Sequence, residues 1–120
     1  MDLNEYQEKA MTTCLESSNN PMYMLLNLSG EIGEINSLLA KAIQKGYIAI
    51  INNDIAVVGD SEEATAIAKD LEKELGDVLW QLSGLCEKLG FTLEGIAKTN
   101  LEKLASRKKR GVIYGNGDNR

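Results

Sequence analysis

The 120-residue sequence contains no histidine, one proline and only two cysteines. Without histidine, Ser-His-Asp and Cys-His catalysis are excluded, and the commonest zinc ligand is missing. Cys14 and Cys86 are far apart and lie outside any CxxC pattern, so a buried thiol in each of two helices is favoured over a disulfide. Any metal site must therefore use oxygen ligands, which suit magnesium or manganese.

Charge and hydropathy exclude further classes of protein. The net charge is −5, which argues against a protein that binds nucleic-acid backbones through a basic face. No apolar run reaches the roughly 18–20 residues of a membrane helix. The first five residues are acidic and polar, unlike a signal peptide. We therefore expect one domain in the cytoplasm, with no nucleic-acid or membrane partner.

Apolar stripes at steps of three and four predict four helices. Their expected ranges are Leu3 to Ser17, 21–45, Asp60 or Ser61 to 89, and 93–110. Asp2 and Glu5 have the spacing of a capping box, and Asn20 and Thr92 are expected to cap the second and fourth helices. A glycine is expected to end each of the last three helices: Gly46, Gly90 and Gly111.

The segment between the second and third helices contains two β-branched runs around an Asn-rich turn, Asn52-Asn53-Asp54. This pattern predicts a short β-hairpin over about residues 47–59, with an irregular loop as the alternative. An isolated hairpin is marginal in water, so it should pack on helices or on another subunit. The expected fold is all-α: a four-helix-type bundle over residues 1–110, with this hairpin inserted, followed by a tail over 111–120.

Two matched acidic motifs lie on the helices that flank the hairpin: Glu31-Ile32-Gly33-Glu34 and Glu74-Leu75-Gly76-Asp77. Acids three residues apart share one side of a helix, and both pairs border the apolar stripe. A solvated acidic face would have cations at helical neighbours, but the only basic one is Lys73. Two such pairs at a helical seam would repel each other, and a divalent metal would relieve that repulsion.

Glycine occupies the same place in both motifs. Gly33 and Gly76 each cost ~1 kcal/mol relative to alanine inside a helix. Their matched positions suggest the close approach of another backbone or of a ligand.

At this point the chain resembles the MazG-like nucleotide pyrophosphohydrolases of the all-α NTP pyrophosphatase superfamily. The resemblance rests on the two acidic motifs, and it covers most of the chain. It extends to the following segments: Glu5-Tyr6-Gln7, the run Val78 to Leu82, Asn100 with Lys103, Leu104 and Arg107, and the ending Arg110 to Arg120. The segment between the motifs is longer than in compact members, and the excess is assigned to the hairpin.

The resemblance implies an enzyme that acts on phosphoric anhydride bonds. In this reading Glu31, Glu34, Glu74 and Asp77 are the metal ligands and catalytic residues, with Mg²⁺ as the cofactor and Mn²⁺ as an alternative. Water attacks the α-phosphorus of a nucleoside triphosphate, standard or modified, and the products are the monophosphate and pyrophosphate. One of the four acids can serve as the general base.

A triphosphate also needs cationic partners. Lys103, Arg107 and Asn100 share one face of the fourth helix and are predicted to contact substrate, with Lys41 a lesser candidate. The alternative for the basic run 107–110 is a favourable interaction with the helix dipole. The tail is apolar at 112–114, so we expect it to fold back over an active site, its own or a neighbour's, where three further residues would contact substrate: Asp118, Asn119 and Arg120.

Two other functions remain open at this stage. One is a narrower enzyme of the same superfamily, dUTPase-like or a phosphoribosyl-ATP pyrophosphohydrolase. The other is a non-enzymatic helical module whose acids form a structural or protein-binding metal site. Four short helices and a hairpin leave apolar surface uncovered, so a homodimer or homotetramer is expected.

Overall fold

The structure, a computed structural model, describes residues 1–59 and 61–120, except for the side chain of residue 61. Its elements are, in order, α1 (Leu3–Met11), a 3₁₀ turn (Glu16–Ser18), α2 (Pro21–Gln44), β1 (Ile48–Ile51), β2 (Asp54–Val57), α3 (Ser61–Leu89) and α4 (Leu93–Lys109). The predicted all-α fold with one inserted hairpin is confirmed. Asp60, one of the two predicted starts of the third helix, lies outside the described residues.

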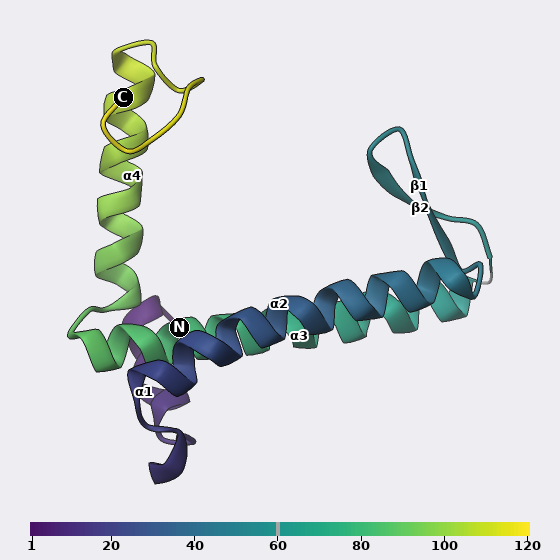
Figure 1. The fold of residues 1–120 in the computed structure, drawn as a ribbon, viewed down its shortest axis with the longest axis horizontal. Coiled ribbons are helices and arrows are strands. Elements are labelled where there is room, and N and C mark those ends of the chain that lie inside the picture. The colour runs from purple at the N-terminus through teal and green to yellow at the C-terminus, as the bar shows by residue number, and fades with distance from the viewer. Residues whose placement is uncertain (60) are drawn as a thin grey trace.

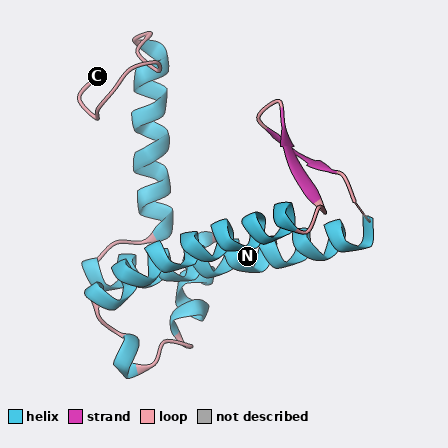
Figure 2. Cartoon of the chain, turned by 45° about the vertical axis from the view of Figure 1, so that its right-hand side comes forward, coloured by secondary structure: helices cyan, strands magenta, loops and turns pink. Residues whose placement is uncertain are grey.

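The long helices α2 and α3 lie side by side and antiparallel (Figure 1). The hairpin projects from one end of this pair, and α4 rises from the other end, where α1 also packs (Figure 2). The radius of gyration is 17.9 Å, against about 14 Å for a compact chain of this length. None of the described helices has the length and apolarity to cross a bilayer. A single chain therefore has an open shape, with α4 extending away from the helical pair.

The core of the helical pair depends on one close approach between α2 and α3. Met24 is fully buried, and a Cβ built on Gly84 would lie 2.6 Å from its Cε. The missing side chain at residue 84 thus makes room for Met24. Ser83 beside it is also fully buried and donates its hydroxyl to the carbonyl of Leu79 (2.8 Å). This contact places the first turn of α2 against the C-terminal part of α3.

The first helix is shorter than predicted. The hydroxyls of Thr12 and Thr13 donate to the carbonyls of Lys9 and Ala10 (2.6 and 2.7 Å), and α1 ends at Met11 instead of Ser17. Such side-chain bonds give the backbone an alternative to the helix. Cys14 therefore lies in the following turn and is only half-buried, so its placement in a helix was wrong; both cysteines are free thiols, as predicted.

The other helix boundaries follow their local signals. Asp2 and Glu5 form a reciprocal capping box, and the side chains of Asn20 and Thr92 cap α2 and α4. Gly46, Gly90 and Gly111 all have positive φ, from 71° to 78°. The residue after each glycine donates to a carbonyl five positions back, at 2.8 to 3.0 Å, which is the Schellman ending that glycine favours.

The hairpin turns at the predicted Asn-rich segment, but the turn has two residues, and Asp54 already belongs to β2. Asn52 and Asn53 both have positive φ (53° and 63°), as a type I′ turn requires, and the register pairs Ile50 with Ile55 and Ile48 with Val57. Of these four apolar side chains only Ile48 is buried; the other three are about half exposed. Among the described residues the hairpin thus packs on α2 near its base, and the rest of its apolar face is about half exposed.

Gln7 fastens α1 to the turn between α3 and α4. It is buried, and its amide nitrogen donates to Glu87 Oε2 (2.9 Å) and to the carbonyl of Phe91 (3.1 Å). Its Oε1 accepts the backbone N–H of Leu93 (2.7 Å), one of the N–H groups that a helix start leaves unpaired. One side chain thus holds the end of α3 and the start of α4 together.

The fit of Met24 against Gly84 predicts opposite effects at two glycines of the helical pair. Gly84→Ala forces a methyl group into the space of Met24 and should lower the free energy of unfolding by about 1–3 kcal/mol. Gly30→Ala, where an added Cβ meets nothing within 4 Å, should raise it by about 0.5–1 kcal/mol. Urea unfolding of both variants measures the difference. Equal effects at the two positions would contradict the close packing.

Candidate functional site

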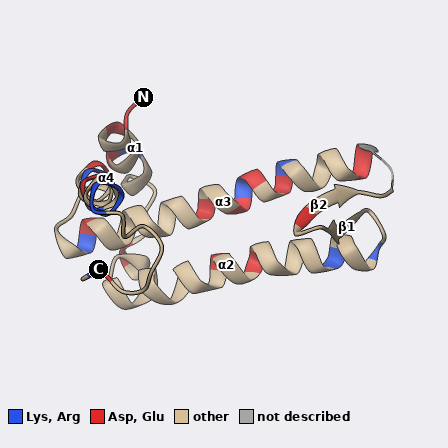
Figure 3. Cartoon of the chain, turned by 90° about the horizontal axis from the view of Figure 1, so that it is seen from above, with Lys and Arg blue, Asp and Glu red and all other residues tan. Residues whose placement is uncertain are grey.

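The two acidic motifs meet across the seam between α2 and α3. Carboxylate oxygens of Glu31, Glu74 and Asp77 all lie within 4.8 Å of one another. Glu31 and Glu74 are half-buried, and Asp77 is exposed. Figure 3 shows acidic segments midway along both helices. We call these three residues the carboxylate cluster; Glu34, the fourth predicted ligand, is exposed and lies one turn further along α2.

The cluster is electrostatically unfavourable by itself. Burial raises the pKa of Glu31, and the negative charges of Asp77 and Glu74 raise it further. Within residues 1–59 and 61–120, none of the ion pairs involves these carboxylates; Lys73, the predicted basic neighbour, instead lies 4.0 Å from Asp70. Converging hard oxygen donors without a cation are what a divalent metal requires. The donor set therefore fits magnesium or manganese.

Two neutral side chains that interact with the cluster, Gln81 and Tyr6, lie in segments that carry the family resemblance but were not predicted as site residues. Gln81 is buried and hydrogen-bonds Glu31, which lowers the pKa of that carboxyl, while its Oε1 has no partner among the described residues. Tyr6 on α1 is influenced by the cluster through its charge: burial and the charge of Asp77 raise the pKa of Tyr6, and a hydrogen bond with Ser83 opposes this. Gln81 follows Asp77 by one turn and could have been found as a polar residue on an apolar face. The contact of Tyr6 spans more than seventy residues and leaves no local signal.

The glycines of the two motifs face open space within a single chain. A Cβ built on Gly33 or Gly76 meets nothing within 4 Å. The expected close approach is thus not made by the described part of this chain. It stays a prediction for a ligand or a second copy.

The predicted phosphate-binding residues gather at the far end of α4. Lys103 Nζ and Arg107 Nη2 lie 3.1 and 3.0 Å from the same oxygen, Oδ1 of Asp118. These hydrogen bonds and charges, those of Lys103 first, hold the pKa of Asp118 below its usual range. The tail therefore folds back onto its own α4, which rises away from the carboxylate cluster of the same chain (Figure 1). That it covers an active site stays a prediction.

The remaining predicted substrate residues are dispersed. Asn119 is exposed at the end of the tail, and Arg120 donates to the tail carbonyls of Val112 (3.1 Å) and Ile113 (3.3 Å). Lys41 is exposed and lines, together with residues of α3, a hollow at the other end of the helical pair; it lies seven residues and so roughly 10 Å beyond Glu34. Within one chain the structure brings together three of the acids, and separately Lys103, Arg107 and Asp118.

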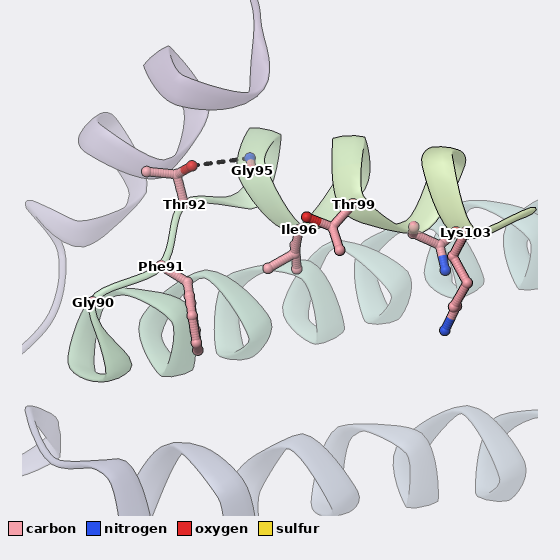
Figure 4. Close-up of a pocket in the computed structure, with 8 residues that line it drawn as sticks. Gly90, Phe91, Thr92, Gly95, Ile96, Thr99 and Lys103 are labelled. Atoms are coloured by element: carbon pink, nitrogen blue, oxygen red, sulfur yellow. Dashed lines mark hydrogen bonds between the residues drawn. The ribbon is translucent and has the colours of Figure 1, made fainter. Parts of the chain in front are cut away.

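Asn100 borders an open hollow on the inner side of α4. The hollow is lined by Gly90, Phe91, Thr92, Gly95, Ile96, Thr99, Asn100 and Lys103. Figure 4 shows Phe91, Ile96, Thr99 and Lys103 along this lining. It combines apolar surface with an amide and a cation, which suits a ligand that has both an apolar and an anionic part.

Trp80 is used for packing. It is half-buried, and its indole nitrogen donates to Thr13 Oγ1 (2.9 Å) and to the carbonyl of Ala10 (3.2 Å). These contacts hold the end of α1 against α3. Trp80 therefore serves the packing of the fold, which is the usual role of a single tryptophan on an apolar helix face.

Comparison with known proteins gives a family match that spans helices α2 to α4. The family model of the MazG nucleotide pyrophosphohydrolase domain matches residues 19–112, a span that contains both acidic motifs and ends just beyond α4. The chain is also similar to the Gene 37 protein of Mycobacterium phage L5, with 35% identity over 129 aligned positions that cover the whole of both chains. No solved structure gave a significant match.

The chain belongs to the MazG nucleotide pyrophosphohydrolase domain family. The predicted family is thus confirmed. Members generally use a divalent metal, and the carboxylate cluster is the candidate site for one in this chain.

Removing one cluster carboxylate should weaken metal binding. We expect Glu74→Gln to lower the affinity for Mg²⁺ or Mn²⁺ by at least about tenfold, because even outer-shell changes at metal sites cost that much. Glu72→Gln, an equal change of charge at an exposed position of the same helix, is the control and should bind as the wild type does. Isothermal titration calorimetry without nucleotide measures both. Unchanged affinity in Glu74→Gln would exclude the cluster as the metal site.

Proposed function

We propose that this protein is a Mg²⁺-dependent nucleoside triphosphate pyrophosphohydrolase, with Mn²⁺ as an alternative ion. The observation that carries the proposal is the carboxylate cluster: three oxygen donors within 4.8 Å, without a cation in the described chain, on the two helices that bear the family's motifs. The reaction is hydrolysis of a phosphoric anhydride bond. Its products are the nucleoside monophosphate and pyrophosphate.

The chain's own carboxylates supply the ligands and the base. Glu31, Glu74 and Asp77 would hold the metal, with Glu34 available one turn away on α2. A divalent ion bound there neutralises phosphate charge and lowers the pKa of water. The attacking water gives its proton to a cluster carboxylate as its oxygen bonds to the α-phosphorus. The bond to the bridging oxygen then breaks, and pyrophosphate leaves with the electron pair.

The groups on α4 supply the positive charge. Lys103 and Arg107 are close enough to share one oxygen of Asp118, so they can share an oxygen of a phosphate in the same way. The hollow beside Lys103 and Asn100 offers Phe91 and Ile96 for the less polar part of the substrate. Together they would bind the triphosphate and its nucleoside along one face of α4.

A second copy of the chain would bring the two halves of this site together. The cluster lies on the α2–α3 pair, and the cations lie on α4, which rises away from that pair (Figure 1). Large apolar side chains are exposed on all three helices, among them Leu25, Ile32, Leu75 and Leu101. A subunit interface would cover such side chains. We propose a homodimer or homotetramer in which α4 of one copy faces the carboxylate cluster of another.

A panel of standard and modified nucleoside triphosphates tests the reaction. With Mg²⁺ the wild type should release pyrophosphate and a monophosphate, and Glu74→Gln should reduce the rate by at least about a hundredfold because a proposed ligand is lost. Glu72→Gln should retain full activity. Circular dichroism checks that both variants are folded. If dUTP or phosphoribosyl-ATP alone is cleaved, the enzyme is one of the narrower types; if nothing is cleaved, the cluster serves a non-enzymatic module.

Mixing two defective variants tests the shared site. Glu74→Gln removes a carboxylate of the cluster. Lys103→Ala removes one member of the cation pair, Lys103 and Arg107, so each variant alone should have little activity. After subunit exchange about half of the dimers are mixed, and each mixed dimer has one intact site if the two halves come from different copies. The mixture should then recover about a quarter of wild-type activity. Mixed dimers seen by native mass spectrometry without recovery would place the whole site in one chain.

A further inference from the structure

The described tail forms a closed loop on α4 that presents one carboxylate to the cation pair. Arg120 turns back and donates to carbonyls of the tail itself, at Val112 and Ile113. The chain's last carbonyl accepts from Arg110 Nη2 (2.8 Å), and Arg107 Nη2 also donates to the carbonyl of Gly117 (3.2 Å). Asp118 is thus held over Lys103 and Arg107 by the whole loop.

Asp118 satisfies the two cations only in part. A single oxygen, Oδ1, accepts from both Lys103 and Arg107. Arg107 is 5% exposed, and its Nε is buried without a partner among the described residues. A guanidinium normally binds a carboxylate or phosphate through two parallel hydrogen bonds. The present contact therefore leaves donor capacity unused that an anion with more oxygens can take up.

The contact is also easily broken. The side chain of Asp118 is 82% exposed, and ion pairs with one exposed partner add little stability because water and salt screen them. A polyphosphate carries several charges and at least three oxygens on each terminal phosphate, so it competes favourably for the same pair. The tail would then have to leave or shift.

We propose that Asp118 occupies the phosphate-binding position of Lys103 and Arg107 in the ligand-free chain and that an incoming phosphate displaces it, opening the tail loop. This inference rests on the proposed function for the identity of the ligand, since the phosphate chain of a nucleotide is the anion that Lys103 and Arg107 would take. It makes Asp118 an internal competitor of the substrate and not a contact to it. The tail loop is accordingly closed before substrate binds and open afterwards.

Binding of inorganic tripolyphosphate in the presence of EDTA tests the proposal without metal or turnover. Asp118→Asn removes the competing charge, and its affinity should exceed that of the wild type by about two- to fivefold, which is the range for an exposed ion pair. Asp54→Asn makes the same change of net charge on the distant hairpin and should leave the affinity unchanged. Lys103→Ala, added to Asp118→Asn, should abolish the gain. Calorimetry measures all four proteins.

Hydrogen exchange of the C-terminal peptide reports on displacement directly. Tripolyphosphate should speed exchange of the amides of residues 115–120 in the wild type, because the loop opens. Weaker or equal binding by Asp118→Asn, absence of binding by every protein, or slower exchange on ligand addition would each overturn the proposal. The outcome does not depend on catalysis: loss of the proposed function would appear as failed nucleotide hydrolysis, with tripolyphosphate binding and tail opening still measurable.

Discussion

The repulsion within the carboxylate cluster is the constraint around which the rest of the molecule is arranged. Packing of Met24 against Gly84 brings α2 and α3 close enough for three carboxylates to converge. Nothing in the described chain neutralises them, and burial adds to the penalty for charging Glu31. A folded chain that keeps such a cluster gains free energy from any cation that binds there and not to the unfolded chain. Metal binding and stability of the helical pair are therefore linked.

The cation pair on α4 presents the complementary problem. Lys103 and Arg107 are held close together, and Arg107 is buried, so their positive charges also need a partner. The tail supplies one through Asp118, but with a single exposed oxygen. In the proposed function, a triphosphate bound to a divalent metal would join the two unsatisfied groups, because its oxygens would serve both the metal and the cations. The open shape of the chain is the reason for proposing that a second copy supplies one half of the site.

The features that could be predicted from the sequence are those that depend on neighbouring residues. Helix starts at Asn20 and Thr92, the stops at Gly46, Gly90 and Gly111, and the Asn52-Asn53 turn depend on residues within a few positions, and all were predicted. Convergence of the two acidic motifs followed from their matched i, i+3 spacing beside apolar stripes, although their role as ligands stays a prediction.

The features that were missed depend on contacts between distant segments. Gln7 joins α1 to the α3–α4 turn across some eighty residues, and Tyr6 approaches Asp77 from the same helix. The early end of α1 came from competition between two threonine hydroxyls and the helix. The direction of α4 and the pairing of Asp118 with Lys103 are set by tertiary packing, which periodicity does not encode.

The inserted hairpin lies away from the carboxylate cluster of its own chain. It follows α2, which continues ten residues beyond Glu34 to Gln44, so its base lies roughly 15 Å along the helix from the last acidic residue. It stands at the opposite end of the helical pair from α4 (Figure 2). Ile50, Ile55 and Val57 remain about half exposed on one face of two strands that have no further partner. A two-stranded sheet of this kind needs a covering surface to be stable. The extra length between the motifs thus lies away from the carboxylate cluster, and in the proposed oligomer its exposed apolar side chains would give a second copy a surface to cover.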